Sequence, residues 1–253
     1  MKQLIACIAI ISILSSCASS KNQLIKYKPK GKDVYSNNNL KTFLKTYSNP
    51  NIVLRVPNSI EAVTTKNTGE SLISSNTDYS NTMDRYYNAI EKELLKGGFS
   101  VRDRGLFNEV LKKMERDTKQ NIDYSQIKDL TNTDIILEVI KIDPVVKYVT
   151  NKLSTLNRRG EWIETSTSTE YKRYGASAEF KIILVRNNEM AGTYTFHYSP
   201  CPDGCITKYT APKVKISKKG ITSAPPAYEG VEVNRMEEFI KECTRDLINA
   251  IKT

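Results

Sequence analysis

The sequence predicts an α+β fold: a mixed β-sheet with helices packed on it, a long β-hairpin insertion and a C-terminal helix. Some segments place apolar residues at every third or fourth position, which is the period of a helix, whereas others alternate apolar and polar residues as strands do. In chain order they predict strand, helix, strand, helix, short helix, strand, two β-hairpins and a helix. That order indicates one domain built on one sheet.

The first residues predict a lipoprotein signal peptide. Lys2 precedes an apolar run at residues 4–14, and Leu14-Ser15-Ser16-Cys17 has the residue order of a bacterial lipobox. The run is too short to cross a bilayer as a mature helix. We expect residues 1–16 to be removed and Cys17 to be acylated. The alternative is an ordinary cleaved signal peptide that contains a cysteine.

The next segment, residues 17–48, is rich in Lys, Asn, Ser and Tyr and has few apolar residues, so it predicts a flexible tether after the acylated cysteine. The folded domain is expected to cover residues 49–253. It begins with a short β-rich run at residues 52–56 that Pro57 stops. Residues 58–80 are polar and predict a long loop or a weak hairpin.

Two amphipathic helices follow, separated by a strand at residues 99–102. Asn81 is expected to cap the first helix and Gly97-Gly98 to end it; the second follows Asp103. A short helix is expected at residues 124–130, before the strongest β signal of the chain at residues 135–142. The apolar stripes of the two long helices are Met83, Tyr86, Tyr87, Ile90 and Leu94, and Leu106, Phe107, Val110, Leu111 and Met114.

The second half of the chain predicts two hairpins and a last helix. Residues 144–176 form two Thr-rich and Tyr-rich alternating segments about a turn at 157–160, and the next hairpin turns at 186–189. Residues 206–230 are expected to form a loop with a short strand at 213–216. Asn234 and Glu237 resemble a capping box for the final helix, whose stripe is Met236, Phe239, Ile240, Cys243, Leu247 and Ile251.

The chain has a formal net charge of +10, with 38 basic and 28 acidic residues. Since the predicted signal exports the protein, nucleic acid is not expected as a partner. A basic surface outside the cytoplasm suits anionic lipid headgroups, cell-wall carboxylates or an acidic protein. A solvated basic surface without a specific partner is the other interpretation.

Three cysteines remain in the predicted folded part. Cys201-Pro-Asp-Gly-Cys205 favours a disulfide in an oxidising compartment, because Pro-Asp-Gly is a turn sequence. The alternative is a metal site formed by His197, Cys201 and Cys205, which needs a fourth ligand and does not suit the strand-like alternation of this stretch. Cys243 lies on the apolar stripe of the last helix and is expected to be buried.

The sequence shows none of the common catalytic constellations. His197 is the single histidine, and no nucleophile elbow, P-loop, paired zinc-type histidines or dinucleotide fingerprint accompanies it. The carboxylate pairs Glu91 with Glu93 and Glu237 with Glu238 are interpreted as solvated faces of helices. We therefore expect a protein that is not an enzyme and needs no cofactor or metal.

The chain resembles a group of envelope lipoproteins in four features: the lipobox, the early strand, the helix closed by glycine and the strand that ends in Asp103-Arg104. This group comprises relatives of the curli secretion channel and of the penicillin-binding-protein activator lipoproteins. The step Thr133-Asp134 before a central strand and the segment Met190-Ala-Gly-Thr193 add to the resemblance, which covers residues 51–142 and 177–250.

The resemblance implies a role in envelope assembly, in which a lipid-tethered domain docks on a partner or forms a ring. Residues 58–80 and 144–176 lie where the channel members carry membrane-crossing strands, but here they are dominated by polar side chains. We therefore expect an outer-membrane lipoprotein that faces the periplasm and binds an envelope protein or itself. The alternatives are a subunit of a ring-forming secretion channel and a cell-wall or lipid-binding module. Ala18 and Ser19 lack the acidic residue that favours inner-membrane retention in enteric-type bacteria.

Overall fold

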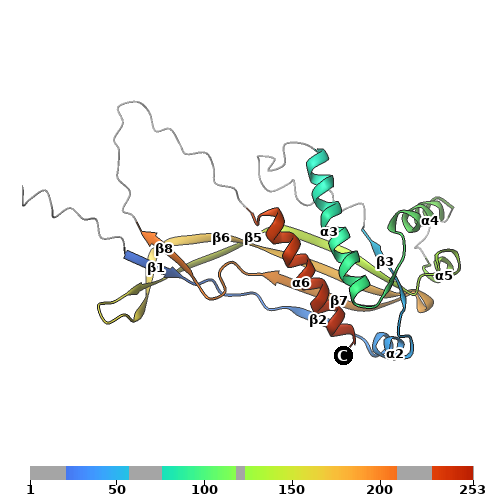
Figure 1. Ribbon diagram of the computed structural model, residues 1–253, viewed down its shortest axis with the longest axis horizontal. Helices are drawn as coiled ribbons and strands as arrows, with labels where there is room; N and C mark the ends of the chain where they lie inside the picture. Colours follow the sequence, from blue (N-terminus) through green and yellow to red (C-terminus); the bar gives the residue numbers. More distant parts are fainter. Residues whose placement is uncertain (1–20, 57–75, 118–122, 210–229, 253) are drawn as a thin grey trace, which may run out of the picture. The chain divides into compact units, whose positions relative to one another are not determined.

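The computed structural model describes residues 21–56, 76–117, 123–209 and 230–252 (Figure 1). The predicted α+β class is confirmed. The described chain forms two compact units. The first contains the residues up to Lys28, Val149–Lys172 and the segment that starts at Cys201. The second contains Pro29–Tyr148, Arg173–Pro200 and the C-terminal segment. The long strands β5 (Ile135–Leu156) and β6 (Trp162–Leu184) contribute residues to both units.

The sheet of the second unit is mixed, as predicted. Its strand order is β4-β3-β5-β6-β7-β2, in which β3 pairs in parallel with both β4 and β5. The strands β6, β7 and β2 pair antiparallel. The further bounds are β2 Asp33–Ser36, β3 Asn51–Arg55, β4 Ser100–Val101 and β7 Glu189–Tyr198.

The main core of the second unit lies between one face of the sheet and three helices. These are α2 (Asn38–Thr46), α3 (Asn76–Lys96) and α6 (Val233–Lys252), the last being the predicted C-terminal helix. Figure 1 shows α3 and α6 side by side over the strands. Their predicted stripes face inward: Ile90, Leu94, Met236, Ile240 and Leu247 are fully buried with Leu54, Leu137 and Phe180 of the sheet. Cys243 is buried on this stripe as expected.

The opposite face of the sheet carries a smaller core under α4 (Arg104–Asp117) and α5 (Ser125–Thr131). Strand alternation separates the two faces: Leu54 and Leu137 face the main core, whereas Val53 and Ile136 face α4 and α5. The side chain of Asp103 caps α4 by accepting a hydrogen bond from the Leu106 backbone N–H at 2.7 Å.

The limits of α3 differ from the prediction at one end only. The helix begins at Asn76, so Asn81 lies inside it rather than capping it. It ends at Lys96 as expected, because Gly98 adopts a left-handed φ of 80° and the backbone N–H of Phe99 donates to the Leu94 carbonyl at 3.1 Å. The remainder of the loop expected at 58–80, residues 58–75, lies outside the described residues.

The prediction of a flexible tether at residues 17–48 is wrong for its described part. Residues 21–46 include β1 (Lys21–Ile25), β2 and α2. Asn37 caps α2 by accepting a hydrogen bond from the Leu40 N–H at 2.9 Å, and Leu40 and Phe43 are buried in the main core. A few apolar residues at the right spacing therefore order a segment whose overall composition is polar.

The predicted hairpin at 144–176 forms, with its turn after Leu156, but it is not an insertion. Its strands are the continuations of the expected strands at 135–142 and 178–185. In the first unit, the ends of β5 and β6 join β1 and β8 (Cys205–Tyr209), where β1 pairs antiparallel with both β5 and β8. The strand β8 was expected to be loop, and residues 213–216 lie outside the described residues.

Candidate binding groove between two helices

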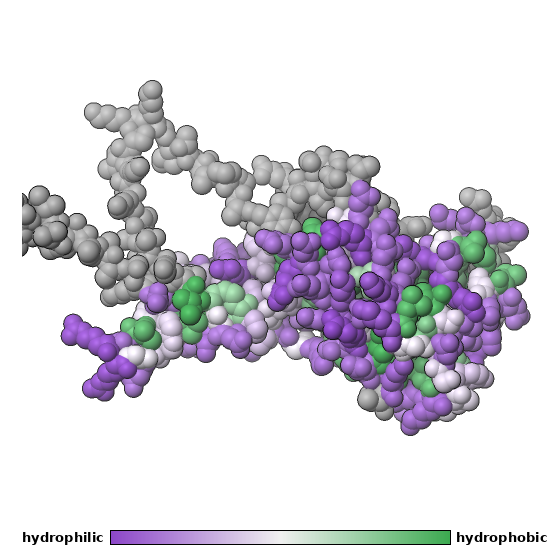
Figure 2. Space-filling view, viewed as in Figure 1, coloured by the Kyte–Doolittle hydropathy of each residue, from purple (hydrophilic) through white to green (hydrophobic). Residues whose placement is uncertain are grey.

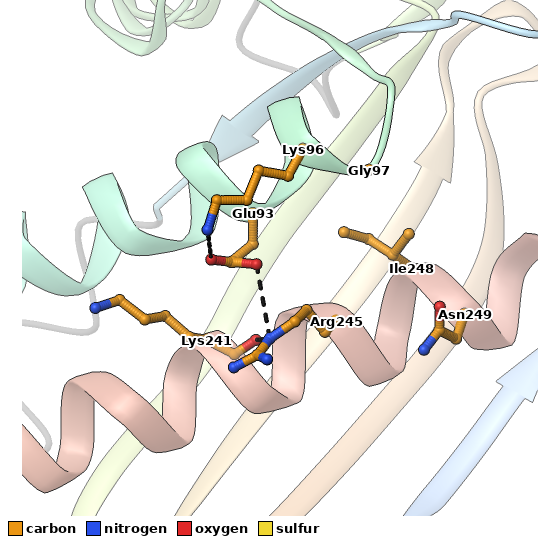
Figure 3. A pocket seen from close by; sticks show the side chains of 7 residues that line it. All are labelled: Glu93, Lys96, Gly97, Lys241, Arg245, Ile248 and Asn249. Atoms are coloured by element: carbon orange, nitrogen blue, oxygen red, sulfur yellow. Dashed lines mark hydrogen bonds and ion pairs between the residues drawn. The ribbon is translucent and has the colours of Figure 1, made fainter.

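A groove of about 580 Å³ lies between the C-terminal halves of α3 and α6 (Figure 3). It is adjoined by a smaller hollow of about 250 Å³, and Lys241 lines both. We call the two together the α3/α6 groove. The lining residues are Glu93, Lys96, Gly97, Lys241, Arg245, Ile248 and Asn249, and, in the smaller hollow, Arg85, Asn88, Ala89, Lys92 and Glu237.

The groove follows from how the two helices pack. Because their apolar stripes point at the sheet, the charged edges of α3 and α6 meet above the core. Gly97 allows a close approach at one end, since a Cβ there would lie 2.9 Å from Cδ1 of Ile248. Lys252 also joins the two helices by donating a hydrogen bond to the Gly97 carbonyl.

Glu93 is the most buried charged side chain of the groove, with 5% of its side chain exposed. Its two carboxylate oxygens point to different cations, as Figure 3 shows: Oε1 is 2.6 Å from Nζ of Lys96, and Oε2 is 3.6 Å from Nε of Arg245. The prediction of a solvated face is therefore wrong for Glu93. A buried carboxylate needs such partners, because an unpaired charge would lose its hydration without compensation.

Glu237 forms the second paired carboxylate of the groove. Nη2 of Arg85 on α3 and Nζ of Lys241 on α6 lie 2.7 and 2.5 Å from its oxygens. The hydrogen bonds from Lys241 and Arg85 lower the pKa of Glu237. Asn234 accepts a hydrogen bond from Arg85 at 3.2 Å and lies inside α6. Asn234 and Glu237, which were expected to cap α6, therefore contact Arg85 of the neighbouring helix α3 instead.

The charge balance of the groove is positive. Five basic and two acidic side chains line it, and both carboxylates are shared between two cations. In the described part of the chain, Lys92 has no carboxylate partner, and it is exposed. The groove can therefore offer several N–H donors and net positive charge to a carboxylate or phosphate group.

A second charged cluster lies on the face of the sheet that α4 and α5 cover. Glu138 is 5% exposed and forms ion pairs with Arg55, at 2.7 Å, and with Lys181. The guanidinium of Arg55 also donates to the Tyr124 hydroxyl at 2.5 Å. The sequence contains one signal for this cluster, a charged residue within the apolar run 135–142, but strand periodicity alone does not identify its partners.

His197 lies in β7 opposite Ser177 of β6 and is half-buried. Burial and the positive charge of Lys30 lower its pKa, against the opposing charge of Glu179. The described residues contain no cluster of three or more His, Cys, Asp or Glu side chains that could hold a metal ion. His197 belongs to the second unit, whereas Cys201 and Cys205 belong to the first.

The structure places Cys201 and Cys205 at disulfide distance, with their Cα atoms 5.3 Å apart, as the turn sequence predicts. Cys201 has a φ of 51° and Gly204 a φ of 102°, which close the turn between them. Cys17 and the signal segment lie outside the described residues. Within those residues, no helix has the length and apolar character needed to span a membrane.

Comparisons with protein-family models, characterised proteins and solved structures find no match to this chain. The resemblance to the envelope lipoproteins stays a prediction from the sequence.

Proposed function

We propose that this protein is a membrane-anchored envelope lipoprotein whose folded part acts as a non-enzymatic binding or assembly module. The lipobox at Cys17 supports the anchor, and the predicted compartment is the periplasmic side of the outer membrane. The observation that carries the binding role is the α3/α6 groove, which has net positive charge and an exposed Lys92. The partner we propose is an envelope protein that presents an acidic segment.

The pairing of the groove carboxylates explains why an acidic ligand is favoured. Glu93 and Glu237 are each held between two cations, so neither is free to repel an incoming carboxylate or to bind a basic one. Lys92 and the N–H groups of the paired cations remain available on the rim. Charges of this kind steer encounter and select partners by sign.

Oxidation of Cys201 and Cys205 belongs to the same proposal, because a disulfide fits export to an oxidising compartment. Peptide mapping without reduction is expected to give one linked peptide that contains both cysteines. If both thiols alkylate freely before reduction, the oxidising compartment is not supported.

Photo-crosslinking in cells tests the binding role. A crosslinking amino acid at Asn88, which lines the groove, is expected to capture a specific envelope protein, whereas the same residue at exposed Glu109 of α4 is expected not to. Lys92→Glu should reduce the Asn88 crosslink several-fold. Lys112→Glu, the same change of charge at an exposed position of α4, should leave it unchanged.

The possible products separate the alternatives. A defined acidic envelope protein supports the proposal. A large homo-oligomer would favour the ring-forming channel, and glycan or lipid adducts would favour a cell-wall or lipid-binding module. Equal crosslinking from Asn88 and Glu109, or equal effects of the two lysine substitutions, would contradict a role for the groove.

A further inference from the structure

We propose that the β5–β6 turn of the first unit docks on an anionic lipid surface, with Trp162 at the membrane interface. The inference deepens the proposed function and rests on the lipid anchor at Cys17. It assigns a second contact with the membrane to residues 156–163 and names the lipid bilayer as the occupant of this surface.

The turn presents exposed apolar side chains: Leu156 and Trp162 lie on one face of its strands, and Ile163, which is 48% exposed, lies on the other. The Asn157 N–H donates to the Glu161 carbonyl at 2.9 Å, and this pair closes the turn and sets Leu156 opposite Trp162. Both side chains are exposed, by 47% and 41%. A charged or amide side chain would be the ordinary choice at an exposed turn, so two large apolar ones need an explanation.

A second apolar pair lies on the same face, on β1 and β8. Leu24 lies opposite Ser154 of β5 and opposite Ile206 of β8. Because side chains two residues apart in a strand share a face, Leu156 lies on the same face as Ser154, and therefore as Leu24 and Ile206. Ile206 is 66% exposed. Leu156 with Trp162 and Leu24 with Ile206 therefore form two apolar pairs on one face of the first unit, with Ser154 between them. Lys152 and Glu164, which form an ion pair, lie on the same face.

Basic side chains lie next to this apolar face. Arg158 and Arg159 occupy the turn itself and are exposed. Figure 2 shows hydrophobic side chains beside strongly hydrophilic ones at the turn that joins β5 and β6 in Figure 1. Trp is favoured at the level of lipid headgroups, and arginine is attracted to anionic lipids. The combination fits an anionic bilayer better than a purely apolar protein surface.

The position of β1 brings the proposed anchor to the same place. Gln23 pairs with Thr155 in antiparallel orientation, so the chain before Gln23 runs toward the β5–β6 turn. β1 begins at Lys21, and the four peptide steps from Cys17 to Lys21 span at most about 14 Å. An acyl chain on Cys17 would therefore hold the leaflet within reach of the turn.

Fluorescence of Trp162 tests the inference, because it is the only tryptophan of the chain. The full protein, reconstituted in vesicles of phosphatidylethanolamine and phosphatidylglycerol, should emit at shorter wavelength than the Cys17→Ser chain in lipid-free buffer. Lipids brominated on their acyl chains should quench this emission about twofold or more. The matched control is a double variant that moves the tryptophan to another position: Trp162→Phe removes it from the turn, and Tyr35→Trp introduces it in β2, where Tyr35 is 60% exposed. This variant should show no such quenching.

Charge and alternative occupants give the opposing outcomes. Arg158→Gln with Arg159→Gln, or vesicles without phosphatidylglycerol, should weaken the quenching. Quenching of Trp162 no stronger than that of the control would overturn the inference. So would a blue shift that depends on protein concentration and not on lipid, because this would indicate a second copy of the chain. The two proposals can fail independently. If the groove function is wrong but the membrane contact is right, the Asn88 crosslink is absent while Trp162 is still quenched.

Discussion

Replacing Glu138 by Gln should destabilise the protein far more than replacing an exposed glutamate does. The carboxylate is 5% exposed and holds Arg55 and Lys181, which are 18% and 28% exposed. Breaking a fully buried ion pair costs about 3–5 kcal/mol, because the remaining charge is left without a partner. Since Arg55 and Lys181 can regain some water, we expect about 2–3 kcal/mol for Glu138→Gln.

The free energy of unfolding is measured by urea denaturation at pH 7, followed by far-ultraviolet circular dichroism. The matched control is Glu238→Gln on α6, whose side chain is 58% exposed and pairs with Arg235 at 2.7 Å. It should change the free energy by less than about 0.5 kcal/mol. Replacing Arg55, Glu138 and Lys181 together by Met, Leu and Met should restore stability to within about 1 kcal/mol of the original chain, because no charge is then left unpaired.

A cost for Glu138→Gln equal to that for Glu238→Gln would refute this reasoning. It would mean that the cluster is hydrated or mobile in solution and that its pairing contributes little. A triple variant less stable than Glu138→Gln would also refute it, because the charges would then contribute more than their burial costs.

Three further predictions concern single residues. NMR titration of His197 should give a midpoint below 6.5, because burial and the charge of Lys30 lower its pKa. The unfolded chain then takes up the proton at higher pH than the folded chain, so the free energy of unfolding should decrease as pH falls below about 6.5. An unchanged midpoint would contradict this. Burial raises the pKa of the Cys243 thiol, so the native protein should not react there with Ellman's reagent, whereas the unfolded protein should. Gly175→Ala should cost about 1–3 kcal/mol in urea denaturation, because its Cβ would lie 2.1 Å from the backbone carbonyl oxygen of Tyr198 and 2.6 Å from the Tyr148 ring. Gly31→Ala, with nothing within 4 Å of the added Cβ, should be close to neutral, and similar costs for the two substitutions would contradict the packing.

The strongly periodic elements could be predicted from the sequence. The stripes that end in Leu94 and Ile251, and the apolar run at 135–142, each bury a long series of side chains, so local pattern and tertiary packing agree. The strands β1 and β2 could not be found in this way. They are short and polar, and β2 is largely exposed, so the pairing with a neighbouring strand defines them rather than their own composition.

The groove depends on information that periodicity does not contain. The sequence places Glu93 among charged residues of a helix, and a solvated position is the usual outcome for such a residue. Glu93 is buried because α6 packs beside it and supplies Arg245, which is 152 positions later in the chain. The partners of Glu237 show the same effect, since the pattern that resembles a capping box is used to contact Arg85 on α3. A turn motif such as Cys201 to Cys205 is predictable because its geometry is local.

The measurement that tests the central claim most directly is mass spectrometry of the N-terminal peptide of the protein extracted from membranes. The account predicts a mature chain that begins at Cys17 and carries diacylglycerol and acyl groups on that residue, and a Cys17→Ser chain that lacks them. A water-soluble mature form with an unmodified Cys17 would contradict the lipid anchor, and with it the proposed membrane-anchored binding role.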